Sequence, residues 1–249
     1  MWKRIFIFRI ILSLLGMILC PPVSGQSLPP AMQYQATGST PLIYHAVFKW
    51  RQDQNEKSLG SRRLELNKKV RRQSDPDHPG FLATQIIATI QSEEAPKGVE
   101  HLTSQLKADF LQTPTGLMTD SFAVEAIPYF GIPLSLMTDP PLAGLEWKGA
   151  WKIRLEDGRE QSIEGHYQIE RLGLLAGHHC AFVTYQVTSL DGEIGFDSAA
   201  RDRWVGQGRY AFDIEVGTLI AHQSELARST DSLSQRRETH YEFAEILVH

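Results

Sequence analysis

The chain has 249 residues with 25 basic and 29 acidic side chains, a formal net charge of −4, and two cysteines. This acidic balance argues against nucleic acid or an anionic membrane surface as the main partner, because both need a basic surface. With so few cysteines, stability has to come from a buried apolar core and not from a disulfide framework.

Residues 1–25 have the pattern of a secretory signal peptide. A basic start (Lys3, Arg4) is followed by an apolar run from Ile5 to Leu19, and small residues precede the expected cleavage after position 25. The alternative is an uncleaved membrane anchor. The run is shorter than the roughly 20 residues of a spanning helix, and Arg9 interrupts it, so cleavage is favoured.

Cys20 raises the further alternative of a lipid-modified N-terminus. Leu19 precedes it, where such motifs require a small residue, so the sequence argues against lipidation. We therefore expect a periplasmic or extracellular protein without an integral membrane segment after cleavage. The signal contains three of the 25 basic residues and no acid, so the exported part has 22 basic and 29 acidic residues, a net charge of −7.

Two β-rich halves follow a leader. Residues 26–41 are rich in Pro, Ser, Gly and Gln and are expected to be flexible. From Leu42 apolar and polar side chains alternate, which predicts strands in a first half over 42–125. Its expected strands start at residue 42 and cover 62–70, 81–90 and 102–110, the last of which could also be a helix.

The stretch 126–146 contains several prolines and glycines, which cannot occupy a central strand, so it is expected to connect the halves. The second half, 147–249, alternates again. Asp-Gly pairs at 157–158 and 191–192 and a turn over 173–177 are expected to separate its strands. These strands are expected over 147–155, 161–172, 179–188, 206–214, 217–224 and 238–248.

The two halves share a pattern. Residues 46–53 and 149–156 both carry an aromatic residue, Lys, an apolar residue and Arg in this order, at an offset of 103, and three further blocks follow at offsets of 98 to 102. We expect an internal duplication, although hairpin proteins in general could resemble one another in this way. The predicted fold is all-β: an antiparallel curved sheet or a sandwich, built from two related halves of about 100 residues that form one globular unit.

Seven aromatic residues on the alternating strands are predicted to fill the space between the halves, as core or as ligand contacts. Burying one such ring stabilises the fold by roughly 1.5–3 kcal/mol. They are Phe48, Trp50, Trp147, Trp151, Tyr185, Tyr210 and Phe212.

The sequence assigns no catalytic residue and no cofactor. It has no Gly-x-Ser-x-Gly nucleophile elbow, and Gly206-Gln207-Gly208 lacks the rest of a dinucleotide fingerprint. The one metal candidate is the pair His178 and Cys180, which would share a strand face. A zinc site needs three or four ligands, and no further ligand spacing accompanies the pair, so no metal is assigned.

The stretch 130–222 resembles an uncharacterised group of exported bacterial β-proteins. The resemblance is carried by Leu145-Glu146-Trp147-Lys148-Gly149-Ala150-Trp151 at a strand start and by the later Tyr210-Ala211-Phe212-Asp213 followed by Gly217. It implies an exported β-fold and brings no catalytic residue.

The expected function is that of a non-enzymatic envelope protein that binds an apolar small molecule or a protein partner in the concavity of the sheet. One alternative is a hydrolase with a dispersed site, which would place a histidine within hydrogen-bond reach of a serine or cysteine and of a carboxylate. A structural component of an envelope assembly is the other alternative.

Overall fold

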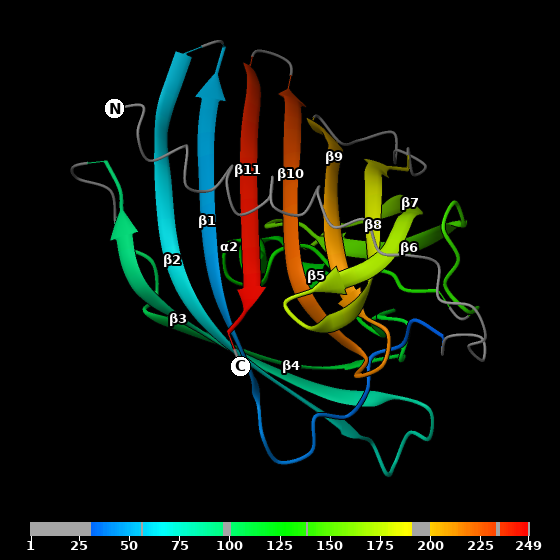
Figure 1. The fold of residues 1–249 in the computed structure, drawn as a ribbon. Coiled ribbons are helices and arrows are strands. Elements are labelled where there is room, and N and C mark those ends of the chain that lie inside the picture. Colours follow the sequence, from blue (N-terminus) through cyan, green and yellow to red (C-terminus); the bar gives the residue numbers. More distant parts are fainter. Residues whose placement is uncertain are drawn as a thin grey trace.

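The fold is a single β-sheet that curls into a half-barrel (Figure 1). Eleven strands lie in the order β4-β3-β2-β1-β11-β10-β9-β8-β7-β6-β5. The computed structural model describes residues 31–55, 57–96, 101–137, 139–190, 200–232 and 235–248. The expected signal peptide, Cys20 and the expected turn at 191–192 lie outside these ranges.

Each strand pairs antiparallel with its neighbours except the short β5, which runs parallel to β6. Between β5 and β6 the chain forms a 3-10 turn, η2 (Val124–Ala126), and one helical turn, α2 (Ile127–Phe130). The strands are β1 (Leu42–Gln54), β2 (Lys57–Ser74), β3 (Leu82–Glu94), β4 (Gln105–Gln112), β5 (Phe122–Ala123), β6 (Glu146–Arg154), β7 (Glu160–Leu175), β8 (His178–Ser189), β9 (Ala200–Asp213), β10 (Thr218–Ser232) and β11 (Gln235–Leu247).

The all-β prediction is confirmed, and the ambiguous segment around 102–110 is strand β4. The expected turn over 173–177 is wrong in its extent. Strand β7 continues through Gly173 to Leu175, and only Ala176 and Gly177 turn, both at positive φ. The strand continues because its end stays paired with β8, with Gly173 opposite Cys180.

The two halves form one sheet and not a sandwich, because β1 from the first half pairs with β11 from the second along most of its length. Across the sheet, β4-β3-β2-β1 is followed by β11-β10 and then by β9-β8-β7-β6, an order that consecutive antiparallel hairpins also produce without a duplication. The face that each block presents is less consistent: Leu66 is buried, whereas Gln168, its counterpart at an offset of 102, is exposed. A slip of one residue reverses the face of a strand, so the duplication stays a prediction.

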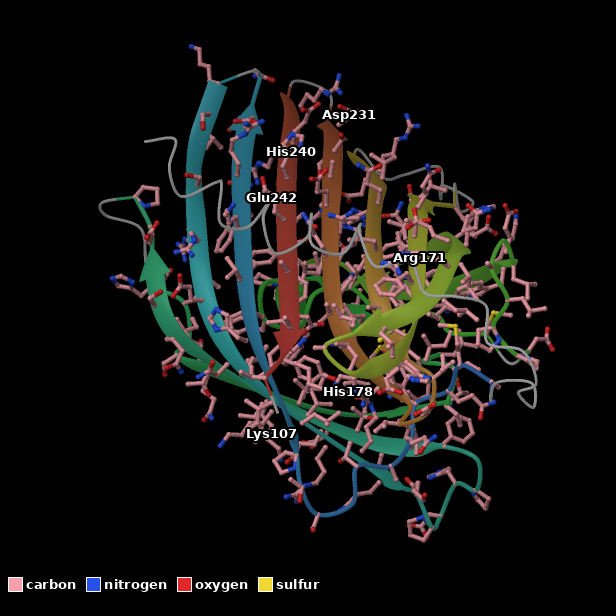
Figure 2. The ribbon with its side chains drawn as sticks, viewed as in Figure 1. Lys107, Arg171, His178, Asp231, His240 and Glu242 are labelled. Atoms are coloured by element: carbon pink, nitrogen blue, oxygen red, sulfur yellow. The ribbon has the colours of Figure 1, made fainter. Side chains whose placement is uncertain are left out.

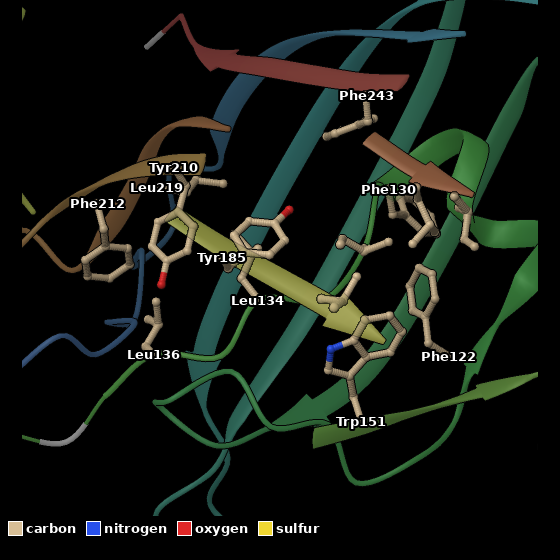
Figure 3. Close-up of a cluster of buried hydrophobic side chains, with 14 of the residues drawn as sticks. Phe122, Phe130, Leu134, Leu136, Trp151, Tyr185, Tyr210, Phe212, Leu219 and Phe243 are labelled. Carbon is tan, nitrogen blue, oxygen red and sulfur yellow. The ribbon is translucent and has the colours of Figure 1, made fainter. Parts of the chain in front are cut away.

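The concave face of the sheet is filled by the chain itself. Residues 124–137, called the plug below, run through the inside of the half-barrel and pack against the inward aromatic side chains (Figure 3). The described part of the expected leader joins them: Met32 is fully buried, and the Tyr34 amide donates to the Pro114 carbonyl at 2.7 Å. The buried plug residues are Val124, Ile127, Tyr129, Phe130, Ile132, Leu134, Ser135, Leu136 and Met137.

Two glycines allow this close packing. A Cβ on Gly149 of β6 would lie 2.3 Å from the Ser135 Cβ, and one on Gly131 would lie 2.8 Å from the ring of Phe243. Gly131 also has a φ of 74°, which favours glycine. The plug packs this closely against β6 and Phe243 because these two positions have no side chain.

Candidate functional site

The predicted aromatic set forms core and not a ligand cavity. Phe48, Trp151, Tyr185, Tyr210 and Phe212 are buried in one cluster with the plug, and Trp50 and Trp147 are half-buried against it. The rings pack on one another: Trp147 stacks on Tyr167 at 5.2 Å between centroids, and Tyr185 lies 6.1 Å from Tyr210. The concavity expected to bind a ligand is thus occupied by the plug.

The pair His178 and Cys180 does not join a metal site. His178 Nδ1 lies 2.7 Å from Asp213 Oδ2, and Cys180 is buried beside them. Burial, and next the negative charge of Asp213, raise the pKa of the Cys180 thiol to about 12, so the thiol is protonated at neutral pH and is not an activated nucleophile. Within the described part of the chain, no three His, Cys, Asp or Glu side chains could hold a metal ion.

A row of buried polar side chains crosses the inner face from β2 to β8. The Lys68 ammonium pairs with Glu245 and also donates to the Phe130 carbonyl of the plug at 3.2 Å. Glu245 lies 3.7 Å from His222 Nδ1, and His222 Nε2 lies 2.7 Å from the Tyr185 hydroxyl. Among the described residues no histidine hydrogen-bonds a serine or cysteine, so the trio that a dispersed hydrolase needs is not found there.

Burial and mutual contacts within this row determine the protonation states of His222 and Glu245. Burial lowers the pKa of His222, which outweighs the opposing effect of Glu245, so the imidazole is neutral at pH 7. Burial by itself would raise the pKa of Glu245, but the Lys68 charge and the His222 contact outweigh it and hold this pKa below its ordinary value. This row therefore contains the buried Lys68–Glu245 ion pair beside a neutral histidine.

The pH dependence of stability should reveal this histidine. Because the pKa of His222 is lower in the folded state, the unfolded state takes up its proton first, and the free energy of unfolding should decline as the pH falls below about 6.5. Glu245 adds a second decline below about pH 4.5, since its folded pKa is also lowered. Urea unfolding between pH 3 and 8 measures both windows.

The variant His222→Gln should lose the decline just below pH 6.5 and keep the one at lower pH. His166→Gln is the control, because His166 is exposed on the outer face. An unchanged slope below pH 6.5 in His222→Gln would contradict the assignment.

The outer face of the sheet carries an apolar groove of about 230 Å³. The end of β7 and residues of β1 and β11 line it together, although four strands separate β7 from β1 in the sheet. The β7–β8 hairpin must therefore bend over the outer face, and Figure 1 shows it crossing in front of the central strands. The bend starts at the bulge between Ile169 and Arg171.

The floor of the groove is a row of small apolar residues. The strand registers place Phe182 opposite Ala211, Ala211 opposite Ala221, and Ala221 opposite Ile246, and Val47 lies opposite Ala244 beside this row. An outer face exposed to water is normally polar, as it is here at His166, Gln168, Gln186, Gln207 and Glu225. The alanine row therefore marks a surface that is covered or binds something apolar.

One end of the groove is cationic. Arg171 lies on the outer face (Figure 2), with its guanidinium 3.7 Å from the ring centre of Phe182. Arg209 also lines the groove and donates to the Gln223 side chain at 3.3 Å. Glu170 also lines the groove near the two arginines. The groove thus combines an apolar floor with a cationic end.

The sequence did not reveal the groove. Each alanine is unremarkable in its own strand, and only the register of β9, β10 and β11 brings Ala211, Ala221 and Ala244 together. The sequence does contain one sign of the groove. At these outward positions alanine stands where the alternation of apolar and polar residues predicts a polar side chain.

No protein-family model matches the chain, and no curated protein matches it. The resemblance of residues 130–222 to exported bacterial β-proteins therefore stays a prediction. Over the described residues, the structure contains no helix that is long and apolar enough to cross a membrane.

Proposed function

We propose that the protein is exported to the periplasm or the extracellular space and binds an amphiphile there, without catalysing a reaction. The bound molecule is a single apolar chain with an anionic head, such as a fatty carboxylate, and its site is the outer groove. The observation that carries the proposal is the row of outward alanines beneath the β7–β8 hairpin, with two arginines at one end.

The dimensions of the groove favour one narrow chain. Pockets for drug-sized ligands enclose roughly 300–1,000 Å³, and this groove encloses about 230 Å³. Each buried methylene contributes about 0.8 kcal/mol, so a chain along the alanine row gains affinity from its length. Arg171 and Arg209 would pair with the anionic head, which fixes the direction of the chain.

The basic start and apolar run of residues 1–25 support export. The half-barrel supports a binding role because its long strands hold the groove residues on a rigid sheet, while the hairpin that covers them is joined at one end only. A protein partner laid across the outer face is a weaker fit, because the hairpin already covers the apolar row.

Filling the groove should weaken binding. We expect Ala221→Trp to weaken binding of the fluorescent carboxylate cis-parinaric acid by about tenfold or more, the equivalent of removing roughly two methylenes from the groove. Ala150→Trp is the matched control, because Ala150 also points outward from the sheet, on β6, and is exposed outside the groove. Equal affinity of the two variants, or no binding by the unaltered protein, would contradict the proposal.

The cationic end is tested separately with Arg209→Gln. This variant should bind dodecanoate more weakly and dodecanol as well as the unaltered protein does, both measured by displacement of the fluorescent probe. Equal losses for the acid and the alcohol would show that Arg209 does not contact the head.

A further inference from the structure

A second, separate cavity of about 80 Å³ lies inside the half-barrel. It is bounded by β2, β3 and β4 on the sheet side and by the plug on the other, with Gly116 and Phe110 among its walls. The outer groove opens on the opposite face of the sheet, so this cavity is independent of the function proposed above.

Three polar side chains of neighbouring strands line this cavity. Arg72 of β2 lies directly opposite Thr84 of β3, and Thr84 lies opposite Phe110 of β4, two residues before Gln112. Arg72, Thr84 and Gln112 are each at least nine-tenths buried. The register therefore forces all three to the same point of the inner face.

Four polar atoms of these side chains have no partner among the described residues. The Arg72 guanidinium lies 4.1 Å above the ring of Tyr34, but its Nε and Nη1 meet no acceptor among the described residues. Thr84 Oγ1 and Gln112 Nε2 are also without a partner there. Buried donors in native proteins are almost always satisfied, so this cluster calls for a bound acceptor.

The charge of the cavity points to an anion. Lys68 and Glu245, which also line it, form an ion pair and cancel. Arg72 has no carboxylate within ion-pair distance in the part of the chain that the structure describes. A buried guanidinium without a counter-charge is costly, and water would satisfy its N–H groups but leave its charge uncompensated.

We infer that this cavity binds a small oxyanion, a carboxylate or phosphate-type group, held by Arg72 together with Thr84 and Gln112. All three unpartnered nitrogen atoms are donors, and the threonine hydroxyl can donate as well. A water molecule occupies about 30 Å³ of liquid, so the cavity has room for a group of two or three such volumes. The bound oxyanion links three strands to the plug.

The test compares anions at constant ionic strength. The full chain is dialysed against buffer without oxyanions and is then titrated with sodium acetate, sodium phosphate or sodium chloride. The midpoint of thermal unfolding should rise by about 5–10 °C when one of the two oxyanions reaches a hundredfold excess over its Kd, and chloride should not reproduce this rise. Acetate and phosphate distinguish a carboxylate from a phosphate-type ligand.

Arg72→Met should lose this response. The matched control is Arg71→Met, because Arg71 is the next residue on β2, points outward and is exposed. If Arg72→Met does not fold, Thr84→Val and Gln112→Leu remove a donor while keeping a similar size, and each should weaken the response by roughly tenfold. Probe binding in the outer groove should be the same in these variants, which separates this site from the groove.

Native mass spectrometry provides the second readout. An oxyanion that stays bound through purification would appear as an adduct in the unaltered protein and in Arg71→Met, and would be absent from Arg72→Met. The inference is overturned if the unaltered protein shows neither an adduct nor a shift with acetate or phosphate beyond that with chloride, or if Arg72→Met responds equally.

Discussion

Replacing Lys68 by Met is expected to lower the free energy of unfolding by about 3–5 kcal/mol, because it leaves the Glu245 carboxylate buried without its counter-charge. Both side chains are almost completely buried, and the Lys68 ammonium also donates to the Phe130 carbonyl. The substitution therefore removes an ion pair and a tie between the sheet and the plug. Equilibrium unfolding in urea at pH 7 measures the loss.

The double variant Lys68→Met with Glu245→Leu should recover most of this loss, since removing both charges also removes the need to solvate either one. The control is Lys49→Met. Lys49 pairs with Glu242 at 3.1 Å across the same sheet, but both side chains are more than half exposed, so its loss should stay below about 1 kcal/mol. Similar losses for Lys68→Met and Lys49→Met would show that the buried ion pair stabilises the protein no more than an exposed one does.

Trp204→Ala is expected to lower the free energy of unfolding by about 3–5 kcal/mol, through lost apolar burial and the cavity that the indole leaves. Trp204 is fully buried, and its ring stacks on Tyr241 at 6.1 Å between centroids. Chemical denaturation of the variant, compared with the unaltered chain at the same pH, measures the effect.

Trp204→Phe separates ring burial from the indole N–H. Trp204 Nε1 has no partner among the described residues, so replacing the indole removes an unsatisfied donor, and the loss should be below about 1.5 kcal/mol. Trp50→Ala is the control for ring size: Trp50 is half-buried, and its loss should be clearly smaller than that of Trp204→Ala. An equal loss in Trp204→Phe and Trp204→Ala would contradict a packing role.

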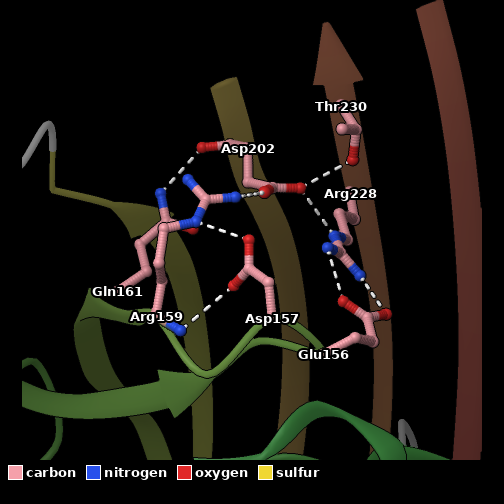
Figure 4. Close-up of polar contacts among 7 residues, drawn as sticks. All are labelled: Glu156, Asp157, Arg159, Gln161, Asp202, Arg228 and Thr230. Carbon is pink, nitrogen blue, oxygen red and sulfur yellow. Dashed lines mark hydrogen bonds and ion pairs between the residues drawn. The ribbon is translucent and has the colours of Figure 1, made fainter. Parts of the chain in front are cut away.

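A charged network centred on Arg228, whose residues Figure 4 shows, lies next to this tryptophan. The Arg228 guanidinium lies 5.3 Å from the Trp204 ring, donates to Asp202 at 2.8 Å and forms two hydrogen bonds with Glu156. Arg159 also pairs with Asp202, at 3.3 Å. Glu156 and Arg159 belong to the β6–β7 turn, so the network fastens this turn to strands β9 and β10 and shields the tryptophan from water.

Trp204 was missed as a core residue because the sequence pattern predicts the start of its strand too late. The alternating pattern predicts a strand from Gly206, whereas β9 begins at Ala200. Trp204 lies on the same inward face as Tyr210 and Phe212, so the period-2 pattern extends back to it once the longer strand is known. The glycines at 206 and 208 interrupt the apolar signal, because their inward positions contribute no side chain that a pattern could detect.

The candidate sites depended on contacts that no single strand contains. In the sequence, Arg72 is one more cation in a basic strand, next to Arg71. Only the pairing of β2 with β3 and of β3 with β4 brings Thr84 and Gln112 beside it. The same holds for the groove, whose floor combines residues of β8, β9, β10 and β11. Chemistry of this kind is set by cross-strand neighbours, and these neighbours are distant in sequence.

The sequence by itself determined the local structure: alternation with period 2 predicted most of the strands and the inward direction of Phe48, Trp151 and Tyr185, because a strand turns successive side chains to opposite faces whatever its partner. The tertiary structure alone decided which strands meet, as when β1 pairs with β11 almost 200 residues later. It also decided that the plug fills the concavity and that the β7–β8 hairpin covers the outer face. Pairing and closure are long-range choices that depend on register and on the packing of the whole core, and the pattern of one strand contains neither.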